Sequence, residues 1–225
     1  MHESDWLGKW EFWREVWRGK SPARILMNLE IRKRVQLSGR AVDLGSGVNP
    51  SYRRFLDVSD VELVRVDFPG VGYPDVATSL ESPLPFHDNL FDGALLFNVL
   101  EHIYASEQLL AEICRILKPS GSLYLFVQFL VQVHLVPYDY RRFTGIALER
   151  MFADAGFSAW TVVPLGKACL SIVAAAYPLL FSPLLRIPAL IGAGLGDILL
   201  ERMSTRHPNW PFNLWASGYF ACVSK

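Results

Sequence analysis

Short apolar runs alternate with amphipathic stretches through the middle of the chain, and this alternation predicts strands separated by helices. The runs that fit strands cover residues 41–44, 62–67, 93–97 and 122–129. Residues 93–97 are apolar at nearly every position, which is typical of a parallel strand covered on both faces. A helix predicted to start at Ser106 and to end near Lys118 places its apolar side chains on one face. The pattern therefore predicts an α/β fold.

The N-terminal stretch reads as helical from residue 4 to about residue 36, with a second helix from Pro22 through Arg34. Four indoles recur at steps of four, three and four residues, so they share one helix face. They are Trp6, Trp10, Trp13 and Trp17. This stripe either packs on the domain or forms a lid or an interfacial anchor, because indole favours the boundary between apolar and wet phases.

About fifty residues lie between the last two predicted strands, residues 158–165 and 218–224. The stretch 168–185 carries no charged residue. It has the length of a spanning helix, but Pro178 and Pro183 interrupt it, and proline inside a helix costs about 3 kcal/mol. We therefore expect two or three short apolar helices that form a lid or a face for a partner or a membrane. A dimer contact and extra core are the alternatives.

The first strand runs into a tight turn with two glycines, Gly45 and Gly47, after which Asn49 and Pro50 can cap and start a helix. Strand, glycine turn and helix form the first unit of a nucleotide-binding fold. A dinucleotide fingerprint would require glycine at position 50. Asp43 at the mouth of the turn would repel phosphate. It suits a ligand that carries an ammonium group and no phosphate, such as S-adenosylmethionine.

The segment from Asp43 to Asn49 resembles the glycine-rich first motif of class I S-adenosylmethionine-dependent methyltransferases, Asp-x-Gly-x-Gly-x-Gly, with Asn49 in place of the last glycine. The resemblance, to the type 11-like group that acts on small molecules and in glycan pathways, spans roughly residues 38–165. It implies a Rossmann-like, doubly wound, seven-stranded sheet with an antiparallel last strand. The implied divisions are an N-terminal helical cap (1–37), a cofactor-binding core (38–165), an apolar helical insertion (166–214) and the last strand of the core (215–225).

Asp67 closes the second predicted strand, 24 positions after Asp43, close to the offset at which an acid reaches ribose hydroxyls in such folds. Similar methyltransferases use an acid there in that role. Ser79 stands where many relatives place an acid that holds the adenine amino group, so Ser79 or a backbone carbonyl would have to serve. The residues implied to bind the cofactor are Asp43, Gly45, Ser46, Gly47, Asp67, Phe68, Ser79, Leu80, Asn98 and Val99.

A polar and aromatic run from His134 to Thr144 precedes a predicted helix over 144–155, and similar runs occur in many small-molecule and glycan-pathway members of the group. The residues implied to bind the acceptor are Tyr138, Asp139, Tyr140 and Arg141. Alternatively, the two charged residues of this set only pin the loop by ion pairing. His134, on the methyl-facing edge, is the first candidate for a general base. His102 is the second, with hydrogen bonding to the backbone as its alternative role.

Composition adds a charge argument and a hydropathy argument. The formal net charge is zero and the pI is about 7.0, which gives no electrostatic case for a nucleic-acid partner. The three cysteines are far apart and lack metal-ligand spacing. We therefore expect reduced thiols in a cytoplasmic protein and no bound metal. The apolar fraction of 51% is high for a soluble enzyme, and the excess is not spread evenly along the chain.

Together these patterns predict an enzyme that moves a methyl group from S-adenosylmethionine to an oxygen of a small, glycan- or lipid-linked acceptor. We expect it in the cytoplasm, peripheral to the membrane, with a homodimer as an open alternative. A catalytically silent methyltransferase-like binding module is the alternative of another class, because positions 49 and 79 depart from the family pattern. An NAD(P)-dependent reductase is disfavoured, since no tyrosine has a lysine four positions later.

Overall fold

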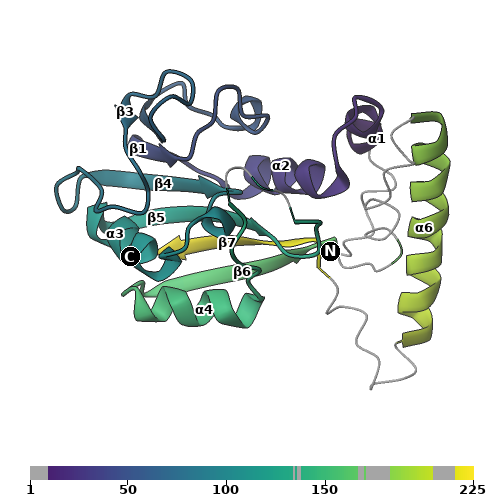
Figure 1. Ribbon diagram of the computed structural model, residues 1–225. Helices are drawn as coiled ribbons and strands as arrows, with labels where there is room; N and C mark the ends of the chain where they lie inside the picture. The colour runs from purple at the N-terminus through teal and green to yellow at the C-terminus, as the bar shows by residue number, and fades with distance from the viewer. Residues whose placement is uncertain (1–9, 134, 136–137, 167–169, 171–182, 205–215) are drawn as a thin grey trace. The chain divides into compact units, whose positions relative to one another are not determined.

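A seven-stranded sheet organises the fold, in the spatial order β3-β2-β1-β4-β5-β7-β6 (Figure 1). The computed structural model describes residues 10–133, 135, 138–166, 170, 183–204 and 216–225. The strands are β1 (Gly39–Leu44), β2 (Val61–Asp67), β3 (Val76–Ala77), β4 (Phe91–Phe97), β5 (Leu117–Gln128), β6 (Ala159–Leu165) and β7 (Gly218–Ser224). The helices are α1 (Trp10–Trp17), α2 (Pro22–Arg34), α3 (Ser106–Ile116), α4 (Gly145–Asp154) and α6 (Pro183–Ser204), with the 3-10 turns η2 (Arg53–Phe55) and η3 (Leu100–His102).

The strand directions are those of the expected sheet. Strands β1 to β5 pair in parallel. Strand β7 runs against β5, because Phe129 N donates to Ser217 O (2.8 Å) at one end and Lys225 N donates to Gly121 O (3.0 Å) at the other. The Rossmann-like sheet of seven strands with an antiparallel last strand is therefore confirmed.

The strand order fixes where a ligand can bind. From β1 the chain adds β2 and β3 on one side, and from β4 it adds β5 on the other. In sheets of this kind, ligands bind outside the carboxyl ends of the strands at the point where the order reverses. The residues that follow Leu44, Asp67 and Phe97 therefore meet at one edge of the sheet.

Helices α3 and α4 cover one face of the sheet (Figure 1). Their apolar residues recur at helical spacing, so each helix presents one apolar face to the strands. Helix α3 buries Leu109, Leu110 and Ile113, and α4 buries Leu148 and Phe152. These contacts hold the strands in place and fix the position of their carboxyl ends.

The segment after β1 differs from the prediction. Only the 3-10 turn η2 follows the glycine turn, so the α-helix expected to start at Asn49 and Pro50 is wrong. Tyr52 and Phe55 are buried, and Leu56 has an extended backbone (φ −93°, ψ 137°) that ends the turn. Two inward aromatic side chains three positions apart anchor a single turn, and this is too little to hold a longer helix.

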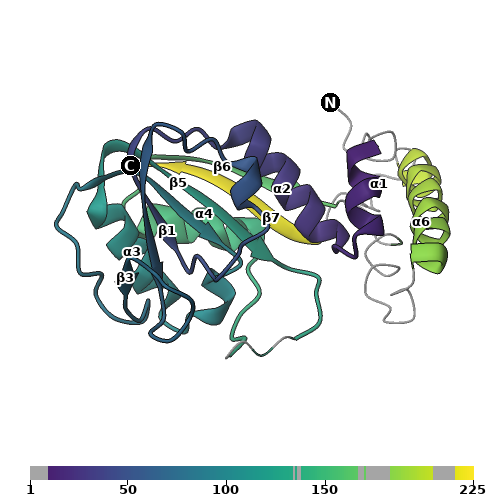
Figure 2. The ribbon, with the colours of Figure 1, turned by 90° about the horizontal axis from the view of Figure 1, so that it is seen from above.

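Within the described residues, the chain divides into two compact units. Its described residues in the sheet unit are 28–128, 133, 135, 138–163 and 219–225. Those in the helical unit are 10–27, 129–132, 164–166, 170, 183–204 and 216–218. In the helical unit, α1 packs beside α6 (Figure 2).

Helix α6 has 22 residues and is longer than the short helices expected in the insertion. Pro183, expected to interrupt the apolar stretch 168–185, begins α6, where a missing amide hydrogen costs nothing. Pro188 lies inside the helix near its start, and Pro178 lies outside the described residues. None of the helices in the described part of the chain combines the length and the apolar character needed to cross a membrane.

Helix α1 turns two of its indoles outward. Trp10 is 78% exposed and Trp17 is 57% exposed, whereas Phe12 and Val16 are buried. Packing of the tryptophan stripe on the rest of the protein is therefore wrong for these two side chains. Trp6 lies outside the described residues.

Candidate cofactor and acceptor site

The glycine turn after β1 is shaped by two positive backbone angles, φ +71° at Gly45 and φ +62° at Gly47. A Cβ atom at Gly45 would lie 2.5 Å from Val99 Cγ2, so only glycine fits there. A Cβ atom at Gly47 would meet nothing within 4 Å. The amides of Gly45 and Ser46 donate to Val66 O, at 2.8 and 3.2 Å. Hydrogen bonds to β2 thus fix the turn, and its backbone is open to a ligand at Gly47.

Asp67 connects this turn to the end of β2. Its Oδ2 accepts from Gly47 N (2.6 Å), and its Oδ1 accepts from Phe68 N (2.7 Å). An ionised carboxylate offers about four acceptor sites. Asp67 therefore retains capacity for two further donors, the number that a ribose diol supplies. The Phe68 side chain is exposed beside it.

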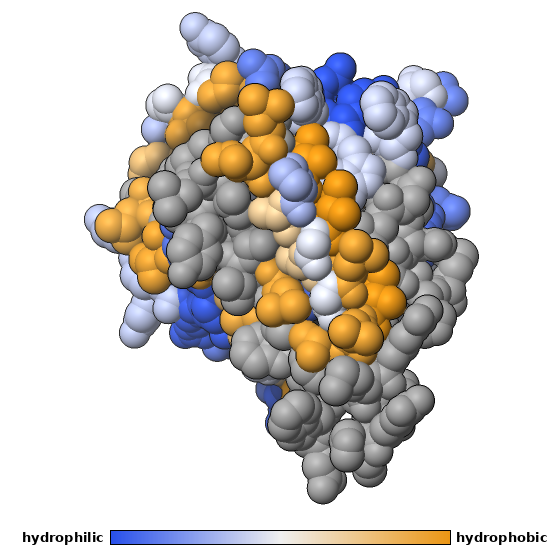
Figure 3. All heavy atoms as spheres, turned by 90° about the vertical axis from the view of Figure 1, so that its right-hand side faces the viewer, coloured by the Kyte–Doolittle hydropathy of each residue, from blue (hydrophilic) through white to orange (hydrophobic). Residues whose placement is uncertain are grey.

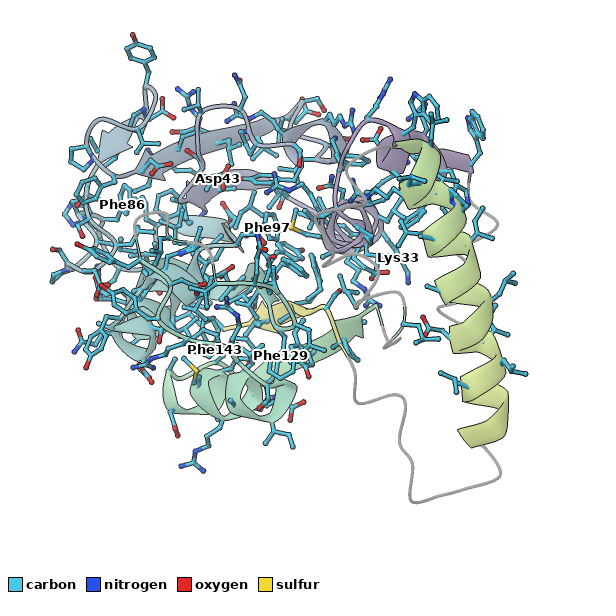
Figure 4. The ribbon with its side chains drawn as sticks, turned by 45° about the vertical axis from the view of Figure 1, so that its right-hand side comes forward. Lys33, Asp43, Phe86, Phe97, Phe129 and Phe143 are labelled. Carbon is cyan, nitrogen blue, oxygen red and sulfur yellow. The ribbon has the colours of Figure 1, made fainter. Side chains whose placement is uncertain are left out.

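Asp43 was expected at the mouth of the turn, and this is wrong. The residue is fully buried among core side chains (Figure 4). Tyr52 Oη lies 2.8 and 2.9 Å from the two carboxylate oxygens and donates to them. Burial raises the pKa of Asp43 to about 6, and the Tyr52 hydrogen bond and the Arg53 charge offset part of this rise. The physical reason is that Tyr52 folds back over the end of β1 and closes it from solvent.

Asn98 ends β4 in the left-handed region (φ 56°), which asparagine tolerates better than most residues. Its amide donates to Phe126 O (2.9 Å), so the chain leaves the sheet at the same edge as the glycine turn. Ser79 lies after β3, where its Oγ accepts from Glu81 N (3.2 Å). The Leu80 side chain packs against the core. The predicted cofactor residues thus follow the ends of β1, β2, β3 and β4.

Three exposed tyrosines form a cluster beyond η3. The ring centroids of Tyr104 and Tyr140 are 5.5 Å apart, and those of Tyr138 and Tyr140 are 5.6 Å apart. All three side chains are exposed. Tyr104 was not predicted as a site residue. It lies two residues after His102 but far along the chain from the loop 138–142, so no sequence signal links it to that loop. We call Tyr104, Tyr138 and Tyr140 the tyrosine cluster.

The charged residues of the predicted acceptor loop are paired within the chain. Asp139 is bound by Arg142, with Nη2 to Oδ2 at 2.6 Å, and its side chain is buried. Arg141 instead donates to Glu107 Oε1 (2.5 Å) and to Ser106 Oγ (3.0 Å). Ion pairing does pin this loop, but Asp139 and Arg141 pair with other residues and not with each other.

The backbone of this loop also holds His102. Nδ1 of His102 lies 2.5 Å from Tyr138 O. A carbonyl oxygen only accepts, so Nδ1 carries the proton, and the lone pair of the neutral ring is on Nε2. His102 therefore makes the backbone contact that was its alternative role. His134, the first candidate for a base, lies outside the described residues.

Glu101 is a buried acid that the sequence did not single out. The residue is fully buried, and its two carboxylate oxygens have no hydrogen-bond partner among the described residues. Burial raises its pKa to about 7, with Arg142 opposing and Asp139 reinforcing the rise. Its own carbonyl accepts from Tyr140 N (2.9 Å), so it lies directly under the acceptor loop. A lone acid before a histidine carries no sequence signal of burial.

The described side chains include no group of three His, Cys, Asp or Glu residues that could hold a metal ion. The donor set at the sheet edge instead fits a cationic nucleoside. The backbone of the glycine turn is open at Gly47, where a nucleoside can approach, and the Asp67 carboxylate can accept hydrogen bonds from ribose hydroxyls. None of these groups is a cation suited to phosphate.

Residues 43–125 match the family model described as a methyltransferase domain. No curated protein matches the chain. A solved S-adenosylmethionine-dependent methyltransferase from Archaeoglobus fulgidus is 15% identical, with a TM-score of 0.60 over 94% of this chain and 97% of that one. One from Thermotoga maritima is 16% identical, with a TM-score of 0.57 over 99% and 97%.

A further solved structure is the 1,6-didemethyltoxoflavin-N1-methyltransferase of Burkholderia thailandensis, with S-adenosylhomocysteine bound. It is 19% identical, with a TM-score of 0.54 over 99% of this chain and 86% of that one. At these identities the structural likeness establishes the fold. The family match covers the glycine turn, the ends of β2 and β4, and most of β5. Residues 43–125 are therefore similar to a methyltransferase domain, and the fold is that of solved S-adenosylmethionine-dependent methyltransferases.

Proposed function

We propose that the chain methylates an oxygen of a small, glycan- or lipid-linked acceptor held against the tyrosine cluster. The observation that supports this proposal is the contact between His102 Nδ1 and Tyr138 O, because it joins the imidazole to the loop that carries two of the three exposed tyrosines. His102 and Tyr104 follow the carboxyl end of β4, and Tyr138 and Tyr140 follow that of β5.

The cofactor residues have separable roles in this proposal. The backbone at Gly47 leaves room for the methionine part of the ligand, and Asp67 accepts from the ribose hydroxyls. Asp43 is buried, so it acts by holding Tyr52 and the turn rather than by direct contact. When bound, S-adenosylmethionine supplies an electrophilic methyl group on a sulfonium, and the protein has mainly to orient the acceptor and exclude water.

The acceptor atom follows from the base. A hydroxyl becomes a better nucleophile as it loses its proton, so an O-methyltransferase gains from a positioned base. Nε2 of His102 is the nitrogen that can take this proton. An acceptor carboxylate would need no base. A neutral amine would depend on a base less than a hydroxyl does. The tyrosine cluster adds flat apolar faces with hydroxyl groups at their edges, which suits a sugar ring with its mixed C–H and O–H surface.

The test is to incubate the purified chain and S-adenosylmethionine labelled in its methyl group with a water-soluble and a lipid-soluble cell extract. We expect a labelled O-methyl product in the lipid-soluble extract. In the His102→Gln variant the turnover should fall by about 10²- to 10⁴-fold, with unchanged cofactor affinity by calorimetry. His87→Gln is the matched control, because His87 is an exposed histidine.

Each other outcome has a distinct meaning. Unchanged turnover in His102→Gln would remove the base from the proposal. Label in a water-soluble product alone would count against a lipid-linked acceptor. Cofactor binding without transfer to either extract would favour the silent binding module.

A further inference from the structure

Helix α6 has its polar and apolar faces reversed. Arg186 is only 8% exposed and donates from Nη2 to Lys20 O (3.0 Å). Asp197 accepts from Leu170 N (2.9 Å). Both charged side chains therefore bond to backbone groups of the helical unit. At 100° per residue, positions 186, 190 and 197 share one side of the helix, and Leu190 is fully buried there.

The opposite side of α6 is apolar and exposed. Leu184, Ile191, Leu195 and Leu199 are 75%, 40%, 60% and 60% exposed. Their spacing places them within one helix face, and exposed Pro188 falls between the first two. We call these five residues the α6 stripe. It extends for about 22 Å along the helix, and Figure 3 shows hydrophobic residues along this side of α6.

A surface in contact with water has the reverse arrangement, with charges outside and leucines inside. Single exposed leucines need no explanation, but a continuous apolar face marks an interaction site. Arg186 and Asp197, whose partners are backbone groups, lie on the opposite side of the helix. The helix is therefore adapted to apolar surroundings on its outer side.

Helix α1, beside α6, identifies the kind of surroundings. Trp10 and Trp17 are exposed and lie seven residues apart, so they share a face. Arg14 lies between them on that face, and Arg18 follows. Both side chains are about half exposed, and both also pair with acids of α1, Arg14 with Glu11 (3.8 Å) and Arg18 with Glu15 (3.0 Å). Indole rings favour the boundary between lipid and water, and guanidinium groups are attracted to anionic lipid headgroups. A contact between two protein copies would not require this combination.

We propose that the α6 stripe, with Trp10 and Trp17 of α1, is the surface by which this protein docks on an anionic membrane. Helix α6 lies in the plane of the interface with its leucines in the acyl boundary. The inference deepens the proposed function by placing its acceptor in lipid, and it rests on that function for the acceptor alone. Docking itself needs neither cofactor nor acceptor.

The test is co-sedimentation of the full chain with vesicles of phosphatidylcholine, with and without phosphatidylglycerol. We expect binding to both, stronger with phosphatidylglycerol. In the double variant Leu195→Ser and Leu199→Ser, the partition coefficient should fall at least about tenfold, because two leucine side chains are no longer buried in lipid. Ile146→Ser is the matched control, since Ile146 is an exposed isoleucine on α4, in the sheet unit.

The melting temperature measured by circular dichroism should be the same in the wild type, the double variant and Ile146→Ser, because every substituted side chain is exposed. No binding of the wild type to either vesicle would overturn the proposal, as would full binding by the double variant. Sedimentation velocity gives a third readout. A wild-type dimer that the double variant converts to monomer, without vesicle binding, would show instead that the α6 stripe pairs two copies. Calorimetry with S-adenosylmethionine is independent of all these outcomes, so failure of docking and failure of the proposed function are distinguishable.

Discussion

Helices α3 and α6 arrange the same kinds of residues in opposite ways. Helix α3 buries Leu109, Leu110 and Ile113 against the sheet, while α6 exposes Leu195 and Leu199. Both helices are rich in leucine and isoleucine, so apolar content alone does not separate them. The difference lies in where the charged side chains find their partners.

On α3 the charges pair at the surface. Arg115 donates to Glu112 (2.8 Å) and to Asp88 (2.6 Å), and all three side chains are partly exposed to water. On α6 the charges of Arg186 and Asp197 bond to backbone groups instead. The comparison teaches that a helix is fitted to its surroundings by the placement of its charges as much as by its leucines.

The largest expected effect comes from shortening a leucine on each helix. Leu110→Ala should lower the free energy of unfolding by about 2–5 kcal/mol, because it leaves a cavity in the core. Leu195→Ala should change it by less than about 0.5 kcal/mol, because the side chain is exposed. Urea unfolding followed by circular dichroism measures both. A large loss in Leu195→Ala would mean that the α6 stripe is covered within the chain, and the contrast between the helices would fail.

The elements with one apolar face could be predicted from the sequence. Strand β4 is apolar from Gly93 to Phe97, and α3 repeats its leucines at helical spacing, so both were found near their true bounds. Helix α6 gave no such signal, because it is apolar on its outer face and has glycine and alanine between its leucines. A prediction from periodicity assumes that the apolar face of a helix is buried and its polar face is exposed to water. The α6 stripe is apolar and exposed, so it does not fit that assumption.

The candidate site was predictable as a set of strand ends but not as a set of contacts. Asp67 could be placed because it closes a strand. The burial of Asp43 depends on Tyr52, nine residues away, and the pairing of Asp139 with Arg142 rather than Arg141 depends on how the loop folds. Glu101 was missed because burial of an acid depends on tertiary contacts, and those leave no local pattern.

The second prediction asks whether cofactor binding in the sheet unit is independent of α6. Asp67→Asn should weaken S-adenosylmethionine binding by about 10- to 100-fold, since hydrogen bonds to a charged group contribute about 1.5–3 kcal/mol. The α6 substitution Leu195→Ser should leave the affinity unchanged. Calorimetry measures both.

Asp60→Asn is the matched control for Asp67→Asn, because Asp60 is an exposed acid just before the amino end of β2. Equal affinities in Asp67→Asn and the wild type would remove the ribose contact from the proposal. Weaker binding in Leu195→Ser would show that the two units are coupled.

The third prediction concerns Glu101, the buried acid of the sheet unit. Glu101 has a pKa of about 7 against an ordinary value of 4.5, so the native state holds a proton that the unfolded chain has released. Stability should therefore fall as the pH rises from about 4.5 to about 7, and stay at the lower value above that. Glu101→Gln removes this cost, and it should stabilise the protein at pH 8 by about 1–3 kcal/mol.

At pH 5 the stabilisation by Glu101→Gln should largely disappear, because the wild-type acid is then neutral in the native state. Urea unfolding at both pH values gives the comparison. Glu107→Gln is the control, because Glu107 is an exposed acid whose pKa is lowered, so its difference from the wild type should not grow at high pH. An equal effect of Glu101→Gln at both pH values would show that burial does not raise the pKa of Glu101.

The smallest effect is expected at Arg186, where burial lowers the pKa of the guanidinium. Arg186→Met keeps the length of the side chain and removes a buried charge, so the free energy of unfolding should stay the same or rise by up to about 1 kcal/mol. Vesicle binding should not change, because Arg186 faces away from the α6 stripe. A loss of stability by Arg186→Met would mean that the inward charges hold α6 in its orientation. The leucines would then be exposed as a consequence of those bonds, and vesicle binding would be the only remaining evidence that their exposure serves a membrane.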